Sequence, residues 1–125
     1  MENKNNLQVS AIFKIPEGNH EEFKRRVTEI MKEIRDKGTK ALKYDVFINS
    51  DQSECEVREE YKNSEDIIEH MVKFREFFQT KLFNDFPLDH VVLYGNPSPQ
   101  LLEMTKSIDI RFYSFFQGLE EMIEA

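Results

Sequence analysis

Residues 42–61 read LKYDVFINSDQSECEVREEY, and this stretch decides the fold. Apolar side chains take every second position before and after the polar segment 49–53, NSDQS. That alternation is typical of two strands with one buried face each, and the polar segment holds the residues that turns prefer. The stretch therefore predicts a β-hairpin, whose buried positions are Leu42, Tyr44, Val46, Ile48, Cys55, Val57 and Tyr61.

The flanking sequence adds two strands and two helices to this hairpin. Residues 7–15, LQVSAIFKI, alternate like a strand, and residues 90–95, HVVLYG, are apolar on both faces and predict a further strand. Apolar residues at helical spacing predict one amphipathic helix over about 19–37 and a longer one over about 63–86. The segment 96–100, NPSPQ, is expected to be a connector.

The resulting order is β-α-β-β-α-β, an α+β arrangement. In the ferredoxin-like fold this order forms a four-stranded antiparallel sheet with both helices on one face. We expect residues 1–125 to form one domain, of which 7–97 are the ferredoxin-like core. Residues 107–124 gather apolar side chains on one side of a third helical wheel and predict a C-terminal helix. This helix completes the protomer's own core, or alternatively covers a cavity or reaches a partner chain.

The composition disfavours several classes of function. A chain of 125 residues and 14.9 kDa has the size of one ordinary domain. Its 24 acidic and 17 basic residues give a net charge of -7, which disfavours a nucleic acid partner. No apolar run reaches the roughly 18 residues that cross a membrane, and the single Cys55 cannot form an internal disulfide. These features predict a cytoplasmic protein.

The face of the sheet away from the helices is expected to need a cover. The strand over 90–95 is apolar on both faces, and Phe47 points away from the buried side of its hairpin. Two copies packed sheet to sheet would cover both, which predicts a homodimer. That interface would be hydrated or cross-paired where it meets the charged positions Glu54, Glu56, Arg58 and Glu60.

Glu59 is the most unusual residue of the predicted hairpin. The alternation of Cys55, Val57 and Tyr61 places its carboxylate on the face that the helices should cover. Burial would raise the pKa of this carboxyl and make it a candidate base, whereas a nearby cation would keep it ionised. Alternatively the strand ends here, and Glu59 leans into solvent or pairs with a Lys or Arg.

Two polar residues flank the apolar stripe of the second predicted helix. His70 lies at one edge, where an imidazole can reach both a cavity and water and can transfer protons near neutral pH. Alternatively it is a boundary residue bonded to a carbonyl. Arg75 lies at the other edge, where it can pair with Glu59, bind an anionic substrate or extend along the surface.

The stripe itself contains Phe74 and Phe78, which could line a pocket for a flat ligand or simply fill the core. A metal site is not expected, because His20, His70 and His90 fall on separate elements without ligand spacing. Glycine-rich phosphate loops are absent from the sequence.

One combination of residues resembles a known family. A strand that ends in Glu59-Glu60-Tyr61, a short polar link and a histidine at His70 of the following helix resemble the antibiotic biosynthesis monooxygenase family of dimeric α/β barrels. The resemblance covers roughly residues 7–97. It implies a homodimer with one cavity per protomer between helices and sheet.

The resemblance also implies candidate activities. The cofactor-free oxygenases of that family act on small quinols or phenols, whose deprotonation gives an anion that reduces oxygen. Here His70 would be the base, Glu59 would orient it, Tyr61 or Tyr44 would donate a hydrogen bond, and no cofactor is needed. The haem-degrading branch relies on a helical tryptophan, and this chain has no Trp. Alternatives are a non-enzymatic module that binds a small ligand or dimerises, and a small-metabolite isomerase.

Overall fold

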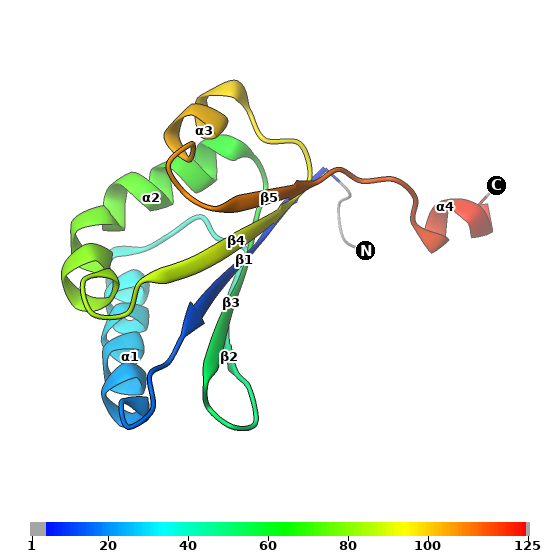
Figure 1. The fold of residues 1–125 in the computed structure, drawn as a ribbon. Helices are drawn as coiled ribbons and strands as arrows, with labels where there is room; N and C mark the ends of the chain where they lie inside the picture. The colour runs from blue at the N-terminus through cyan, green and yellow to red at the C-terminus, as the bar shows by residue number, and fades with distance from the viewer. Residues whose placement is uncertain (1–4, 125) are drawn as a thin grey trace.

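The computed structural model describes residues 5–124, and its elements follow the predicted order with additions at the C-terminal end (Figure 1). Residues 1–4 and 125, which the sequence assigns to the same domain, lie outside the described residues. The elements are β1 (Leu7–Lys14), α1 (His20–Lys37), β2 (Lys43–Ile48), β3 (Glu54–Tyr61), α2 (Ser64–Phe78), the π-helical turn η1 (Gln79–Phe83), β4 (Leu88–Tyr94), α3 (Pro99–Met104), β5 (Ile110–Tyr113) and α4 (Leu119–Glu124).

The strands form one sheet in the order β2-β3-β1-β4-β5. The central strand β1 is antiparallel to both neighbours, and Ala11 pairs with Val57 on one side and Val91 on the other. The predicted α+β ferredoxin-like core is therefore confirmed. The expectation of four antiparallel strands is corrected, because β5 joins β4 in parallel and makes the sheet five-stranded and mixed.

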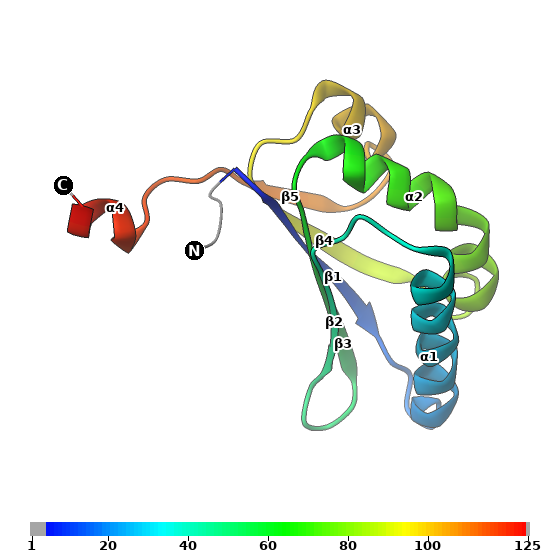
Figure 2. The same cartoon turned by 180° about the vertical axis from the view of Figure 1, so that it is seen from behind.

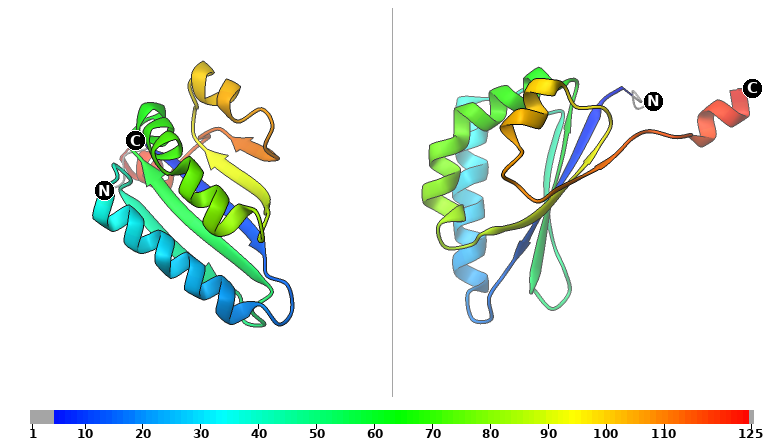
Figure 3. Two further views of the ribbon diagram at one scale, coloured as in Figure 1. Left: turned by 90° about the vertical axis from the view of Figure 1, so that its left-hand side faces the viewer. Right: turned by 45° about the horizontal axis from the view of Figure 1, so that its top comes forward.

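Helices α1 and α2 lie on the same face of the sheet (Figure 3). Helix α1 buries Phe23, Ile30 and Ile34 toward the strands and is followed by Gly38, whose positive φ favours glycine. Helix α2 begins after Asn63, whose side-chain oxygen accepts a hydrogen bond from the Asp66 backbone N–H. At one end of the layer the Phe13, Phe23, Phe83 and Phe86 rings pack against one another.

The C-terminal segment differs from its prediction. Residues 99–104 form the short helix α3, which includes the last two residues of the connector expected at 96–100, and Ser98 Oγ accepts a hydrogen bond from Leu101 N–H. Residues 107–124 are not one helix, because 110–113 pair with β4 as β5. The open edge of β4 offers backbone partners to an apolar and aromatic segment, and those hydrogen bonds outweigh the helical stripe.

Only residues 119–124 of that segment are helical, as α4, which stands away from the sheet and its helices (Figure 2). The proposed completion of the protomer's own core is therefore wrong for this helix, since Leu119 and Met122 are largely exposed. Within residues 5–124, no helix is both long and apolar enough to cross a membrane.

Candidate functional site

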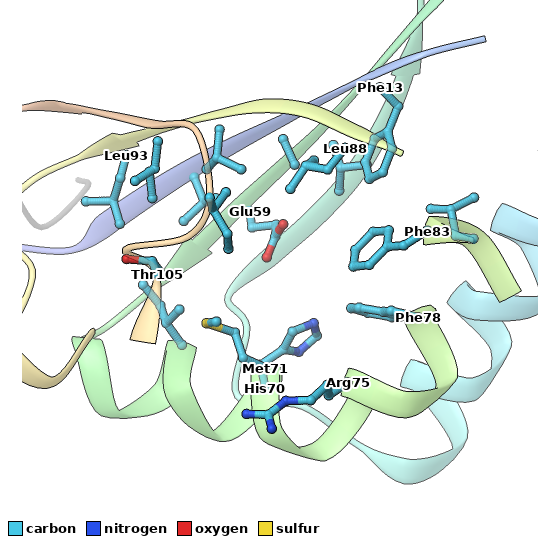
Figure 4. A pocket seen from close by; sticks show the side chains of 18 of the residues that line it. Phe13, Glu59, His70, Met71, Arg75, Phe78, Phe83, Leu88, Leu93 and Thr105 are labelled. Atoms are coloured by element: carbon cyan, nitrogen blue, oxygen red, sulfur yellow. The ribbon is translucent and has the colours of Figure 1, made fainter. Parts of the chain in front are cut away.

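A cavity of about 850 Å³ lies between the sheet and helix α2 (Figure 4). The sheet contributes apolar side chains from β1, β3 and β4, and α2 contributes Met71 and Phe78. Most of its wall is therefore hydrocarbon, which suits a flat organic ligand. The polar groups that reach this wall are few, and Glu59 and His70 are two of them.

Glu59 lies on the cavity side of β3, as its place in the alternation predicts. Its neighbours on the same face, Val57 and Tyr61, are buried. The Tyr61 hydroxyl donates a hydrogen bond of 2.6 Å to Glu59 Oε1. Burial raises the pKa of the Glu59 carboxyl to about 7, although the Tyr61 hydrogen bond lowers it. Near neutral pH this carboxyl is close to half ionised.

His70 projects from α2 toward the sheet, across the cavity from Glu59 (Figure 4). Only 4% of the residue is exposed, so it is not a surface boundary residue. Its Nδ1 lies 2.8 Å from Thr39 Oγ1, whereas its Nε2 is buried and has no hydrogen-bond partner among the described residues. Burial, with a smaller effect of Lys73, lowers the pKa of His70 to about 4. The ring is therefore neutral at pH 7.

Thr39 supports the imidazole, although no sequence signal pointed to it. It lies in the loop between α1 and β2, and its Oγ1 accepts a hydrogen bond of 3.1 Å from the Ala41 backbone N–H. The hydroxyl hydrogen is then free to be donated to His70 Nδ1. This arrangement favours the tautomer in which His70 Nε2 carries the hydrogen.

Tyrosine and phenylalanine rings surround the imidazole. Ring centroids of Tyr44, Tyr61, Phe74 and Phe78 lie 5.3, 5.8, 4.9 and 5.8 Å from that of His70. Tyr44, Tyr61 and Phe78 also line the cavity. Of the two alternatives for Phe74, the structure favours the core, because its ring is buried beside that of His70 and does not line the cavity. Burial is the main cause that raises the pKa of both tyrosines, so each keeps its hydroxyl proton.

Arg75 also lines the cavity, but its side chain is exposed. It forms no ion pair with Glu59, whose described partner is Tyr61. The predicted Glu59–Arg75 pair is therefore not formed, although both residues line the cavity, Glu59 from β3 and Arg75 from α2. Within residues 5–124, no group of three His, Cys, Asp or Glu side chains is arranged to hold a metal ion.

The βαββαβ core resembles that of several solved structures. A structure of MupZ from Pseudomonas fluorescens superposes with a TM-score of 0.76 at 19% identity, over 92% of this chain and 93% of that one. A candidate antibiotic biosynthesis monooxygenase from Nitrosomonas europaea gives a TM-score of 0.59 at 16% identity, over 79% of this chain and 97% of that one.

A further candidate antibiotic biosynthesis monooxygenase, from Bacteroides thetaiotaomicron, gives a TM-score of 0.57 at 14% identity, over 72% of this chain and 86% of that one. At such low identity these likenesses show the fold alone. They confirm the fold expected from the family resemblance. No family model and no curated protein matches the sequence.

Proposed function

We propose that this protein is a cofactor-independent monooxygenase of a small quinol or phenol. One observation carries the proposal. Glu59, with its pKa near 7, and His70, whose buried Nε2 has no hydrogen-bond partner among the described residues, line the same largely apolar cavity from opposite walls (Figure 4). A proton acceptor and a hydrogen-bond donor on either side of one cavity suit the deprotonation of a phenolic hydroxyl.

The pKa values favour exchanging the roles expected from the sequence. A base is most effective when its pKa lies near the working pH, and the pKa of Glu59 at about 7 meets that condition. His70, with a pKa of about 4, is a weak base. We therefore assign proton removal to Glu59. His70 donates from Nε2 to the phenolate oxygen, and Thr39 keeps the imidazole in that tautomer.

The substrate itself supplies all the electrons of this reaction. The phenolate passes them to O₂, one oxygen atom replaces a ring hydrogen as a carbonyl, and the other leaves as water. A phenol and O₂ thus become a quinone and H₂O, and a hydroquinone becomes a hydroxyquinone in the same way. The protein has to supply a base, a donor and a site from which bulk water is excluded.

Oxygen consumption tests this proposal. The wild-type protein, pretreated with a chelator, is mixed with a panel of hydroquinones and phenols in an oxygen electrode, and quinone is followed by absorbance. We expect Glu59→Gln to lower kcat roughly 10²–10⁴-fold, as for a missing general base. The wild-type rate should rise with pH and level off above about 7, as Glu59 loses its proton.

Glu54→Gln is the matched control, because Glu54 lies on the same strand but pairs with Lys14 on the opposite face of the sheet. It should keep wild-type turnover. Turnover that survives Glu59→Gln would remove Glu59 from the mechanism. Panel members that raise the melting temperature without any oxygen uptake would instead favour the non-enzymatic binding module.

A further inference from the structure

We infer that the ring bound in this cavity carries a carboxylate, or a similar anionic group, which Arg75 holds at the cavity mouth. The inference rests on the proposed function for the position of the phenolic end only. It adds a substrate class, an aromatic acid with a hydroxyl group at the far end of the ring. The observations that carry it concern the charges around the opening of the cavity.

The mouth is marked by the residues that line the cavity and are nevertheless exposed. Arg75 is the one cation among these lining residues, and it lies one helical turn before Gln79, the first residue of η1. The exposed lining residues are Arg75, Gln79, Pro87, Asp89, Ser107 and Asp109.

Arg75 differs from every other arginine of the chain. Within residues 5–124 it has no carboxylate partner, even though acidic residues outnumber basic ones by 24 to 17. The other five arginines pair with carboxylates, namely Arg25 with Glu22 and Glu29, Arg26 with Glu22 and Asp85, Arg35 with Asp36, Arg58 with Glu56, and Arg111 with Asp109. An unpaired guanidinium at a cavity opening is available to a ligand carboxylate, which its planar fork can hold through two hydrogen bonds.

The two mouth carboxylates are already engaged. Asp89 lies 2.8 Å from His90 Nδ1, and Asp109 lies 3.6 Å from Arg111 Nη2. Both are contributed by the side of the mouth made by β4 and the α3–β5 connection, whereas Arg75 is on α2. A ligand carboxylate therefore finds an unpaired cation on one side of the opening and only carboxylates on the other, which sets one orientation of the ring.

The spacing along α2 suits a single aromatic ring. His70 and Arg75 are five residues apart, which is a rise of about 7.5 Å along the helix axis. Because His70 and Arg75 leave α2 on opposite flanks, about 140° apart, the long Arg75 side chain has to bend toward the opening. It then meets the carboxylate of a ring whose para hydroxyl lies between Glu59 and His70. The apolar wall between these two ends, which includes Met71 and Phe78, contacts the ring itself.

Binding of a matched pair of compounds tests the inference without requiring turnover. The probes are para-hydroxybenzoate and its methyl ester, titrated by calorimetry into the wild-type protein, Arg75→Ala and Arg75→Lys. We expect the wild type to prefer the acid about tenfold, and Arg75→Ala to bind both compounds alike. Arg75→Lys keeps the charge but not the fork, and should retain part of the preference, which added salt weakens.

Arg35→Ala is the control, because Arg35 is an exposed arginine near the end of α1 and does not line the cavity. It should leave the preference unchanged. A wild type that binds both probes equally, prefers the ester or binds neither overturns the inference, even where quinols are oxidised. A preference that depends on Arg75, found in a protein without oxygen uptake, supports the inference and refutes the proposed oxygenase activity.

Discussion

The two faces of the sheet are built from the same strands, but one face is buried and the other is exposed. On the inner face Val57 and Tyr61 are 7% and 0% exposed, because α1 and α2 cover them. On the outer face Phe47, Tyr94 and Tyr113 are 53%, 43% and 56% exposed, and no helix of the described chain covers them. The alternation along a strand decides only which residues share a face. The helices packed on the sheet decide which of the two faces becomes part of the core.

The two faces also treat their carboxylates differently. Glu59 on the inner face has a raised pKa and a tyrosine partner. On the outer face Glu54 pairs with Lys14 at 2.5 Å, and Ser10 Oγ donates to Glu56 at 2.5 Å. These charged side chains of β3 therefore find their polar partners on the neighbouring strand β1 of the same chain. A carboxylate becomes chemically unusual only where the chain's own helices remove water and leave it without a cation.

The largest contrast between the faces is expected in stability. Phe23→Ala should lower the free energy of unfolding by about 3–5 kcal/mol, because Phe23 is fully buried among Phe13 and Phe86. Phe47→Ala on the outer face should cost about 1 kcal/mol or less. Urea denaturation measures both. Equal losses that do not depend on protein concentration would show that the outer face is covered within the protomer.

Two groups on the inner side of the sheet should also make the free energy of unfolding depend on pH, in opposite directions. The pKa of Glu59 is raised from 4.5 to about 7, so the unfolding free energy falls as the pH rises through that range. The pKa of His70 is lowered from 6.5 to about 4, so the unfolding free energy falls as the pH drops through that range. Each effect amounts to at most about 3 kcal/mol, and in the wild type they offset each other where the ranges overlap.

Single variants separate these effects. In Glu59→Gln only His70 remains, and stability should increase from pH 4 to 6.5. In His70→Asn only Glu59 remains, and stability should decrease from pH 4.5 to 7. Urea denaturation across this pH series measures both slopes. Identical pH profiles for the two variants would show that neither carboxyl nor imidazole is shielded from water.

A substitution on the outer face should have the smallest effect on the stability of the single chain. Its main effect should be on the association of two chains. We expect a second copy of this chain to cover Phe47 and Tyr94, as the exposed aromatic side chains and the family resemblance suggest. Phe47→Asp should then weaken association, because a carboxylate buried in the interface loses hydration without gaining a partner. Sedimentation equilibrium measures it, and a wild-type mass near 14.9 kDa at micromolar concentration would rule the dimer out.

The periodicity of apolar residues predicts secondary structure well where a segment packs one face against one layer of the protein. The alternation in 42–61 identified β2 and β3 and the inward position of Glu59, and the helical spacing placed His70 near the cavity. It misled in 107–124, where Ile108 and Phe112 fit a helical stripe although 110–113 form a strand. Whether 110–113 became helix or strand depended on the free edge of β4, which offers backbone hydrogen bonds. Neither the apolar stripe nor the intrinsic propensities of the segment reveal that edge.

The sequence by itself determined the core elements, the face on which each strand residue lies and the chemical types available to the site, because these depend on local spacing along the chain. Only the tertiary structure decided that Thr39 contacts His70 from 31 residues away, that Phe74 is buried beside the imidazole, and that Arg75 is the one cation lining the cavity mouth. Such relations depend on how loops and helices meet in space, and burial, which sets the pKa of Glu59 and His70, exists only once they have met.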